Sequence, residues 1–241
     1  MNEKLQGIVV NVIKYNDKHN IAHIYTDRRG MLPFLVRQGT THAARMRNAM
    51  FMPLSIIDFE ARLEHGRELG TLHDVRRATM LMSIYSNPVK NAIAMFISEL
   101  LAHAIQEQES NMVLYSYLRN AITRLEQAQG SVANFHICFL YQLGSLIGIQ
   151  PDVDSYRDGY WFNMADGVFT QSPHAGGKAL PPEQARVLER LARMTFDNMH
   201  LFKFTREQRN DILEMILDYY RLHHSTLGTL RSPDVLKQLF V

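Results

Sequence analysis

Three short apolar runs decide the fold class, and the first is β-branched almost throughout: GIVVNVI at residues 7–13, NIAHIYT at 20–26 and MLPFLV at 31–36. β-branched side chains favour strands, and the first run is apolar on both faces, as in a fully buried strand. Between the second and third runs, residues 27–30 (DRRG) form a turn signal, because glycine adopts positive φ without strain. The stretch therefore predicts three consecutive strands.

Two further strands are expected beyond this stretch, at residues 51–63 and 69–75. Charged and apolar residues alternate from Asp58 to Leu63, which is typical of a half-buried strand. A polar stretch from Arg37 to Asn48 comes before them and is expected to be a flexible loop. Five short strands within 80 residues favour a small closed barrel of the oligonucleotide-binding (OB) type, and the same count fits an SH3-like barrel.

Beyond Arg76 the apolar period lengthens from two residues to nearly four, which indicates helices. The start signals are Asn87–Pro88, Pro181–Pro182, the Thr205/Gln208 capping box and Ser232–Pro233, and apolar stripes predict two more helices at about 111–127 and 131–146. We therefore expect an α+β protein, with a five-stranded OB-fold barrel at residues 1–80 and a mostly α-helical domain at 81–241. An irregular region at 148–182 is expected to carry a small β-hairpin.

The chain has 241 residues, of which 46% are hydrophobic and 21% charged, enough apolar material for a core. Its one cysteine, Cys138, excludes an intramolecular disulfide framework and any zinc site built from several cysteines, and fits a reducing compartment. No apolar signal segment opens the chain, and its longest apolar run, residues 92–97, is too short to span a bilayer. A cytoplasmic protein without a membrane partner is expected.

The charge is unevenly distributed along the chain, although the formal net charge is only +2. Residues 1–80 carry 12 basic and 8 acidic residues, a net +4, which leaves 14 basic and 16 acidic residues, a net −2, for residues 81–241. No acid occurs from Arg28 to Ile57, a segment that contains Arg28, Arg29, Arg37, Arg45 and Arg47. A local basic field is typical of a polyanion binder, and a solvated basic face is the open alternative.

Enzyme motifs are absent from the sequence: it has no G-x-S-x-G elbow, no P-loop, no G-x-G-x-x-G after a strand and no H-E-x-x-H. The apolar neighbours of Cys138 favour inert burial over a role as nucleophile. A nuclease could use Asp152, Asp154 and Asp158 with a divalent metal, but these residues lack the spacing of a calcium loop and a partner histidine. We therefore expect no catalysis and no cofactor.

Nucleic-acid binding is the function that the barrel favours, because such barrels bind single strands through a basic groove and aromatic faces on which bases stack. The expected DNA-binding residues are Arg28, Arg29, Arg37, Arg45 and Arg47, supported by Lys14 and Lys18, with Phe34 as a stacking platform. A core position fits Phe34 at least as well. Contact with four or five phosphates predicts that log affinity falls with log salt at a slope of roughly −3 to −3.5. A scaffold whose basic barrel binds an acidic protein partner is the competing class.

Six phrases resemble, in order and over most of the chain, the RecO family of bacterial recombination mediators: Gly7-Ile8-Val9, Tyr25-Thr26-Asp27-Arg28-Arg29-Gly30, Arg37-Gln38-Gly39, Glu68-Leu69-Gly70-Thr71-Leu72, Ser172-Pro173-His174-Ala175-Gly176-Gly177 and Leu230-Arg231-Ser232. The resemblance implies a nucleoid-associated protein that binds single- and double-stranded DNA, anneals complementary strands and acts with RecR. It also implies help to RecA in replacing single-stranded-DNA-binding protein on gapped DNA, and binding of that protein's acidic C-terminal tail by the helical domain.

Two expectations about the helical domain follow from the resemblance. The tail needs an apolar pocket beside a cation, and Arg124 and His136 are the candidates. Many relatives carry four cysteines around the phrase that matches Ser172–Gly177, and these bind zinc. With Cys138 alone this chain cannot form that site, and the hairpin that contains Trp161 and Phe169 is expected to supply the bracing by hydrophobic packing.

Overall fold

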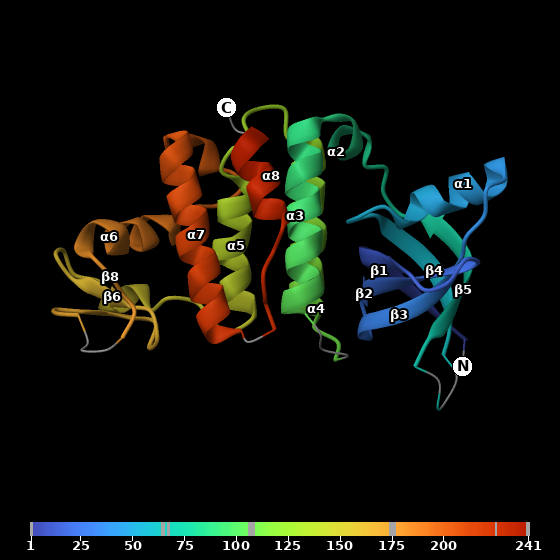
Figure 1. Cartoon of the computed structure of the whole chain (residues 1–241), viewed down its shortest axis with the longest axis horizontal. Helices are drawn as coiled ribbons and strands as arrows, with labels where there is room; N and C mark the ends of the chain where they lie inside the picture. The colour runs from blue at the N-terminus through green and yellow to red at the C-terminus, as the bar shows by residue number, and fades with distance from the viewer. Residues whose placement is uncertain are drawn as a thin grey trace. The chain divides into compact units, whose positions relative to one another are not determined.

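The computed structural model describes residues 2–63, 66, 68–105, 109–173, 177–224 and 226–239 (Figure 1). Residues 174–176 of the family-like phrase at 172–177 lie outside these ranges. The chain forms two compact units, Met1–Gln127 and Ala128–Val241. This boundary lies beyond residue 80, because three helices after the barrel pack with it, and the assignment of 1–80 and 81–241 as separate domains stays a prediction.

The first unit contains a closed five-stranded barrel. Its strands are β1 (Asn2–Lys14), β2 (His19–Thr26), β3 (Gly30–Arg37), β4 (Ile56–Arg62) and β5 (Gly70–Arg77), joined in the order β1-β2-β3-β5-β4. Every neighbouring pair is antiparallel except β3 and β5, which are parallel. This order and pairing are those of an OB fold, so the predicted OB barrel is confirmed and the SH3-like alternative is excluded.

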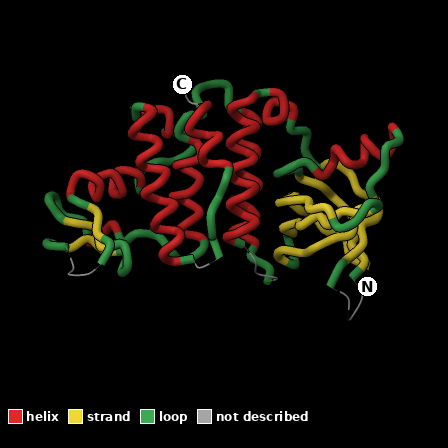
Figure 2. The backbone as a smooth tube through the Cα atoms, in the orientation of Figure 1, coloured by secondary structure: helices red, strands yellow, loops and turns green. Residues whose placement is uncertain are grey.

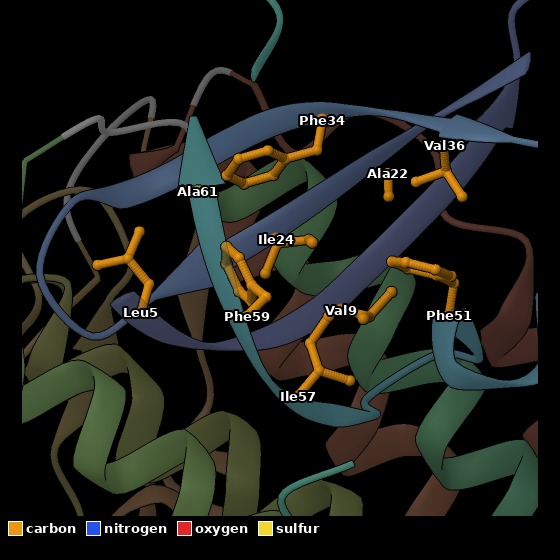
Figure 3. Close-up of a cluster of buried hydrophobic side chains, with 10 residues drawn as sticks. All are labelled: Leu5, Val9, Ala22, Ile24, Phe34, Val36, Phe51, Ile57, Phe59 and Ala61. Carbon is orange, nitrogen blue, oxygen red and sulfur yellow. The ribbon is translucent and has the colours of Figure 1, made fainter. Parts of the chain in front are cut away.

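Apolar side chains from each of the strands β1 to β4 fill the barrel (Figure 3). The core cluster consists of Leu5, Val9, Ala22, Ile24, Phe34, Val36, Phe51, Ile57, Phe59 and Ala61. The rings of Phe34 and Phe59 meet edge to face with their centroids 5.3 Å apart. Burial of each large side chain contributes about 1.5–3 kcal/mol to the free energy of unfolding, so this cluster is what holds the strands together.

A β-bulge interrupts β1. The register with β2 shifts between Val9 and Asn11, which leaves Val10 without a partner on that strand. The Val10 carbonyl accepts a hydrogen bond from the Ser98 hydroxyl of helix α3 (Pro88–Ala104). Because one extra residue reverses the alternation of side chains, Val9 and Val12 both pack against the core.

The connection between β3 and β4 contains a short helix, α1 (His42–Asn48), followed by the 3-10 turn η1 (Ala49–Phe51). The Thr41 hydroxyl starts α1 by accepting a hydrogen bond from the Ala44 amide at 3.2 Å. The predicted flexible loop is therefore wrong for residues 42–48, because Thr41 caps a helix within this polar stretch. Phe51 reaches the barrel core from η1, and the fourth strand begins only at Ile56.

Helices α2 (Met82–Ser86), α3 and α4 (Met112–Gln127) complete the first unit, whose strands are drawn yellow in Figure 2. The predicted cap at Asn87 is present, because its side chain accepts hydrogen bonds from two amides at the start of α3. On α4, the Tyr115 hydroxyl donates to Gln6 of β1 at 3.1 Å, and its ring stacks on Tyr25. These contacts bury part of the outer wall of the barrel.

The second unit contains helices α5 (Phe135–Leu146), α6 (Pro182–Leu191), α7 (Arg206–His223) and α8 (Ser232–Leu239), with 3-10 turns η2 (Val153–Ser155) and η3 (Met199–Leu201). The predicted capping box of Thr205 and Gln208 begins α7. A small sheet joins β6 (Trp161–Asn163), β7 (Val168–Thr170) and β8 (Ala179–Leu180) in the order β7-β6-β8. The expected hairpin is thus confirmed, and β8 extends it.

Aromatic packing holds this small sheet against α7. Phe162 is buried, with its ring centroid 4.9 Å from that of Phe169 and 5.6 Å from that of Tyr219. Phe162 rather than Trp161 therefore partners Phe169 in the cluster. A zinc site built from several cysteines cannot form, because Cys138 is the only cysteine and is buried on α5. Within the described ranges, no three His, Cys, Asp or Glu side chains gather as a metal site.

Candidate nucleic-acid interface

The strand registers place side chains of β1, β2 and β3 in rows across the outer wall of the barrel. After the bulge, residues of odd number on β1 point outward, because they alternate with Val12 of the core. Ile13, Tyr15 and Arg37 are exposed on this wall, and its other outward residues are half-buried. The part that we call the three-strand face consists of Asn11, Ile13, Tyr15, His19, Ile21, His23, Pro33, Leu35 and Arg37. Ile13 is 46% exposed and Tyr15 is 58% exposed, so this face is open at the β1–β2 turn.

Backbone hydrogen bonds order the β1–β2 turn beside this face. The Asn16 side chain accepts hydrogen bonds from the amides of Lys18 (2.9 Å) and His19 (2.8 Å). The Tyr15 amide donates to the His19 carbonyl at 3.1 Å, and His19 pairs with Arg37 of β3. Tyr15, His19 and Arg37 therefore form one row across three strands.

A second row of the face is polar but carries no cation. His23 lies opposite Asn11, with 2.6 Å between its Nδ1 and the Asn11 Oδ1. Burial lowers the pKa of His23 from its ordinary value, which favours the neutral imidazole. The positive charge near the three-strand face therefore comes from lysine and arginine.

Four exposed cations lie at the Arg37 end of the face. We call them the Arg37 cluster: Lys18 in the β1–β2 turn, Arg37 at the end of β3, and Arg45 and Arg47 on α1. None of the four makes an ion pair with a carboxylate among the residues that the structure describes. Lys14, by contrast, lies 3.2 Å from Asp17.

Two close contacts hold α1 and the β1–β2 turn near Arg37. The amide of Gln38 donates to the Lys18 carbonyl at 2.8 Å. At Gly39 the chain passes so near α1 that an added Cβ would lie 2.7 Å from the Cβ of Ala44. Arg45 and Arg47 are two residues apart, about 200° around α1, so their side chains leave the helix on nearly opposite sides.

Arg28 and Arg29 lie in the β2–β3 turn, at the opposite end of β3. That strand has eight residues, so the turn is about 25 Å from Arg37. Arg28 Nε lies 3.6 Å from Asp27 and Arg29 Nε lies 3.0 Å from Glu3. A pocket of about 420 Å³ beside Arg28 is also lined by the acids Asp58, Glu60 and Asp74 and by the bases Lys4 and Arg76. The five predicted arginines therefore do not converge on one face.

Phe34 cannot be a stacking platform, and this prediction is wrong. Its side chain is fully buried in the barrel core, where it packs against Phe59. Phe34 shares its strand with exposed positions but has the inward parity, opposite Ala22 of β2. Tyr25 is buried as well, beneath Tyr115.

The predicted cation at His136 is also wrong. His136 is 2% exposed on α5, and burial, followed by the charge of Arg209, lowers its pKa to about 3. The imidazole is therefore neutral and enclosed, and cannot present a charge to a peptide. Arg124 is exposed on α4, in the first unit, whereas His136 belongs to the second.

The second unit has an apolar groove that the sequence patterns did not indicate. It has a volume of about 380 Å³ and lies between α6 and α7. Its apolar lining is Val187, Phe204, Ile212 and Met215, beside the cations Arg190 and Lys203 and the acids Glu183 and Asp211. The Arg190 guanidinium lies 5.6 Å from the centre of the Phe204 ring. The groove combines an apolar surface with two cations and two acids.

Two further findings bear on the remaining hypotheses. Burial raises the pKa of the Cys138 thiol to about 12, so it stays protonated and is a poor nucleophile. The Asp152 carboxylate accepts a hydrogen bond from the Asp154 amide at the start of η2, a capping role. Across the parts of the chain that the structure describes, no helix has the length and hydropathy to cross a membrane.

Most of the three-strand face was missed from the sequence. His19, Ile21 and Leu35 belong to no recognisable sequence motif. Only the strand registers show that they share a face with Tyr15 and Arg37. The run at residues 7–13 read as buried on both faces, yet Ile13 is exposed. The available signal was the OB prediction itself, because the β2–β3 wall and the β1–β2 loop are where such barrels bind oligonucleotides.

Comparison with known proteins gives consistent matches over the whole chain. Residues 1–80 match the family model described as Recombination protein O N terminal, and residues 85–229 match Recombination protein O C terminal. The proteins named DNA repair protein RecO from Bacteroides fragilis (strain YCH46) and Phocaeicola vulgatus are 38% identical over 241 residues and 36% identical over 240 residues. The protein of that name from Flavobacterium johnsoniae is 31% identical over 241 residues. In each of these three comparisons the match covers 100% of both chains.

Proposed function

The chain belongs to the RecO family, and from this premise we propose that it is a non-enzymatic DNA-binding protein of DNA repair whose Arg37 cluster holds the phosphates. The observation that carries this proposal is the group of four exposed cations, Lys18, Arg37, Arg45 and Arg47, without carboxylate partners among the described residues. Arg28, Arg29 and Lys14 contribute less, because each of them already lies beside an acid.

The mechanism is electrostatic. Cations that neutralise phosphates release bound counterions, and for single strands log affinity falls with log salt by about 0.7 per contact, so four contacts give a slope of about −3. Double-stranded DNA offers the same phosphates and binds the same cluster. Annealing follows when two backbones are neutralised on one protein, because their mutual repulsion is then reduced.

Family membership supports a wider role in recombination. On this proposal the protein acts with RecR, and the pair helps RecA to load on gapped DNA that is coated by single-stranded-DNA-binding protein. The protein would then be found with the nucleoid. The relatives' names extend only to DNA repair, so each of these steps needs its own assay.

Filter binding of a bare single-stranded oligonucleotide across a salt series tests the DNA-binding proposal. We expect binding with a slope of about −3, and an oligonucleotide that stays intact in magnesium. An affinity that hardly changes with salt contradicts the proposal. Absence of DNA binding together with capture of an acidic protein partner favours the scaffold hypothesis, and loss of the intact oligonucleotide favours a nuclease.

For the acidic tail of single-stranded-DNA-binding protein, we propose the α6–α7 groove as the docking site. The support is its apolar lining beside Arg190 and Lys203, because an acidic peptide with an apolar end requires both; Glu183 and Asp211 line the same groove. Arg124 stays a second candidate. Calorimetry with such a peptide should give binding that Lys203→Glu abolishes and Arg124→Glu leaves unchanged. The reverse result places the tail at α4, and no binding by the parent protein contradicts tail binding altogether.

A further inference from the structure

Tyr15 is an aromatic side chain that the fold does not use. It is 58% exposed, and among the described Phe, Tyr and Trp residues it alone belongs to the exposed class. The other aromatic residues of the barrel strands, Tyr25, Phe34 and Phe59, are buried. Burial in the core therefore does not account for a large ring at this position.

The backbone beneath Tyr15 is fixed. Its amide donates to the His19 carbonyl at 3.1 Å, and the neighbouring Asn16 amide donates to the same carbonyl at 3.0 Å. The Asn16 side chain closes the turn through the amides of Lys18 and His19. A ring on an ordered turn loses little conformational entropy when a ligand packs on it.

Positive charge lies at a suitable distance from the ring. Tyr15 has the outward parity of Ile13 and shares a row with His19 and Arg37. Strands are about 4.8 Å apart, so the backbones at Tyr15 and Arg37 are about 10 Å apart. Lys18 stands in the same turn, three residues from Tyr15. A nucleotide whose base rests on the ring thus has cations within reach of its phosphates.

The β1–β2 turn itself carries both an acid and lysines. Asp17 is 96% exposed between Tyr15 and Lys18, and its carboxylate lies 3.2 Å from Lys14. This carboxylate repels a nearby phosphate and offsets one of the two lysines. The apolar row of Ile13, Ile21 and Leu35 continues from Tyr15 across the face, which favours contact with the flat surface of a base.

From these observations we propose that Tyr15 is a base-stacking residue that makes the barrel prefer unpaired nucleotides. The proposal rests on the proposed DNA-binding function and adds a source of selectivity to it. In a duplex both faces of a base are occupied by its neighbours, whereas in a single strand a base can leave the stack and pack on an aromatic ring. The Arg37 cluster serves both forms of DNA, and Tyr15 serves only the single strand.

Fluorescence anisotropy with a single-stranded oligonucleotide and a duplex of the same length tests this assignment. Tyr15→Ala should weaken single-strand binding about tenfold and leave duplex binding unchanged. The salt slope should not change, because stacking releases no counterions. Tyr15→Phe should bind as the parent does, since the ring is retained. An equal loss for both DNAs, a changed slope, or no loss overturns the proposal.

Two controls separate this proposal from the function on which it rests. The variant Arg37→Ala/Arg45→Ala/Arg47→Ala should lose affinity for both DNAs and show a shallower salt slope. If the triple variant loses binding while Tyr15→Ala binds as the parent does, only the stacking role is disproved. If the triple variant also binds both DNAs as the parent does, the Arg37 cluster does not hold the phosphates, and if the parent binds neither DNA, the DNA-binding function itself fails. The thermal unfolding temperature of each variant should match that of the parent, because all four substituted side chains are exposed. A large shift of this temperature in Tyr15→Ala would assign its loss of DNA affinity to misfolding and would contradict the stacking role.

Discussion

The two ends of β3 carry arginines that are alike in the sequence and different in the structure. At one end, Arg28 and Arg29 lie within 3.6 Å and 3.0 Å of carboxylates, beside a pocket with further acids. At the other end, the Arg37 cluster is exposed and makes no ion pair with any described carboxylate. The segment from Arg28 to Ile57 is free of acids, yet Asp27 lies beside Arg28, and Glu3 of β1 lies beside Arg29.

This difference shows that a charge pattern predicts a binding surface only after the partners of each charge are known. Asp58 and Asp74 are distant from Arg28 in the sequence but line the same pocket. A paired arginine must give up its carboxylate before it can hold a phosphate, and a solvated one need not. We therefore expect the two ends of β3 to differ in every DNA-binding measurement.

The largest expected effect is the loss of the Arg37 cluster. Arg37→Ala/Arg45→Ala/Arg47→Ala should weaken single-strand binding about 100-fold at 0.1 M salt, because each of three lost contacts contributes about 0.7 log unit. The salt slope should fall from about −3 to about −1. Anisotropy titrations at several salt concentrations measure both quantities.

The matched variant Arg28→Ala/Arg29→Ala removes the same kind of charge from the other end. We expect its affinity to fall less than about threefold, since these arginines are already paired. Equal losses in the two variants would show that ion pairing does not decide which end binds DNA, and a larger loss at Arg28 and Arg29 would move the site to the β2–β3 turn.

A smaller effect is expected when α1 is displaced without any change of charge. In Gly39→Ala the new Cβ would lie 2.7 Å from the Cβ of Ala44, so α1 must move. Such overpacking costs about 1–3 kcal/mol of unfolding free energy, and the shift of Arg45 and Arg47 should lower DNA affinity several-fold. Chemical denaturation and anisotropy check the two effects.

Gly30→Ala is the control for this prediction at the other end of β3. Gly30 has φ of 64°, so alanine there costs about 1–2 kcal/mol, a loss of stability similar to that of Gly39→Ala. Its DNA affinity should stay at the parent value at a temperature where the variant is folded. A loss of affinity in both variants would tie binding to stability rather than to the position of α1.

The smallest expected effect is a gain of affinity at the paired end. Glu3→Gln removes the carboxylate beside Arg29, which frees the guanidinium for one more phosphate. A long oligonucleotide should then bind about two- to fivefold more tightly, with a slope steeper by about 0.7. An oligonucleotide of about eight nucleotides, within the range for one OB barrel, should bind as before. Equal gains for both lengths would contradict the separation of the two ends.

The fold could be predicted wherever a local signal agreed with the tertiary structure. β-branched runs marked the strands, and Asn87 and the Thr205/Gln208 box marked two helix starts. The sequence pattern does not predict helix α1, because its seven residues lie within a polar stretch that has no apolar stripe. Thr41 is the only signal for its start. The strand order itself depends on pairing between residues distant in sequence, which periodicity does not report.

The site could be predicted only in part, because burial and pairing are tertiary properties. The composition points to the basic barrel as the site, which stays a prediction, whereas Phe34 and His136, predicted to act at the surface, are buried. Whether an aromatic residue of the barrel is core or surface depends on the parity of its strand. For Tyr15 that parity is set by the bulge at Val10.

Whether Tyr15 lies at the surface therefore depends on one extra residue in β1 and not on the chemistry of its side chain. Ser98 supplies the partner that the displaced Val10 carbonyl needs, so the extra residue is supported from α3. If Val10 were instead paired in the ladder as an ordinary strand residue, the register would slip by one residue: Lys14 would turn outward, and Ile13 and Tyr15 would turn toward the core. The composition of the barrel would hardly change, but the surface that it offers to a base would be lost.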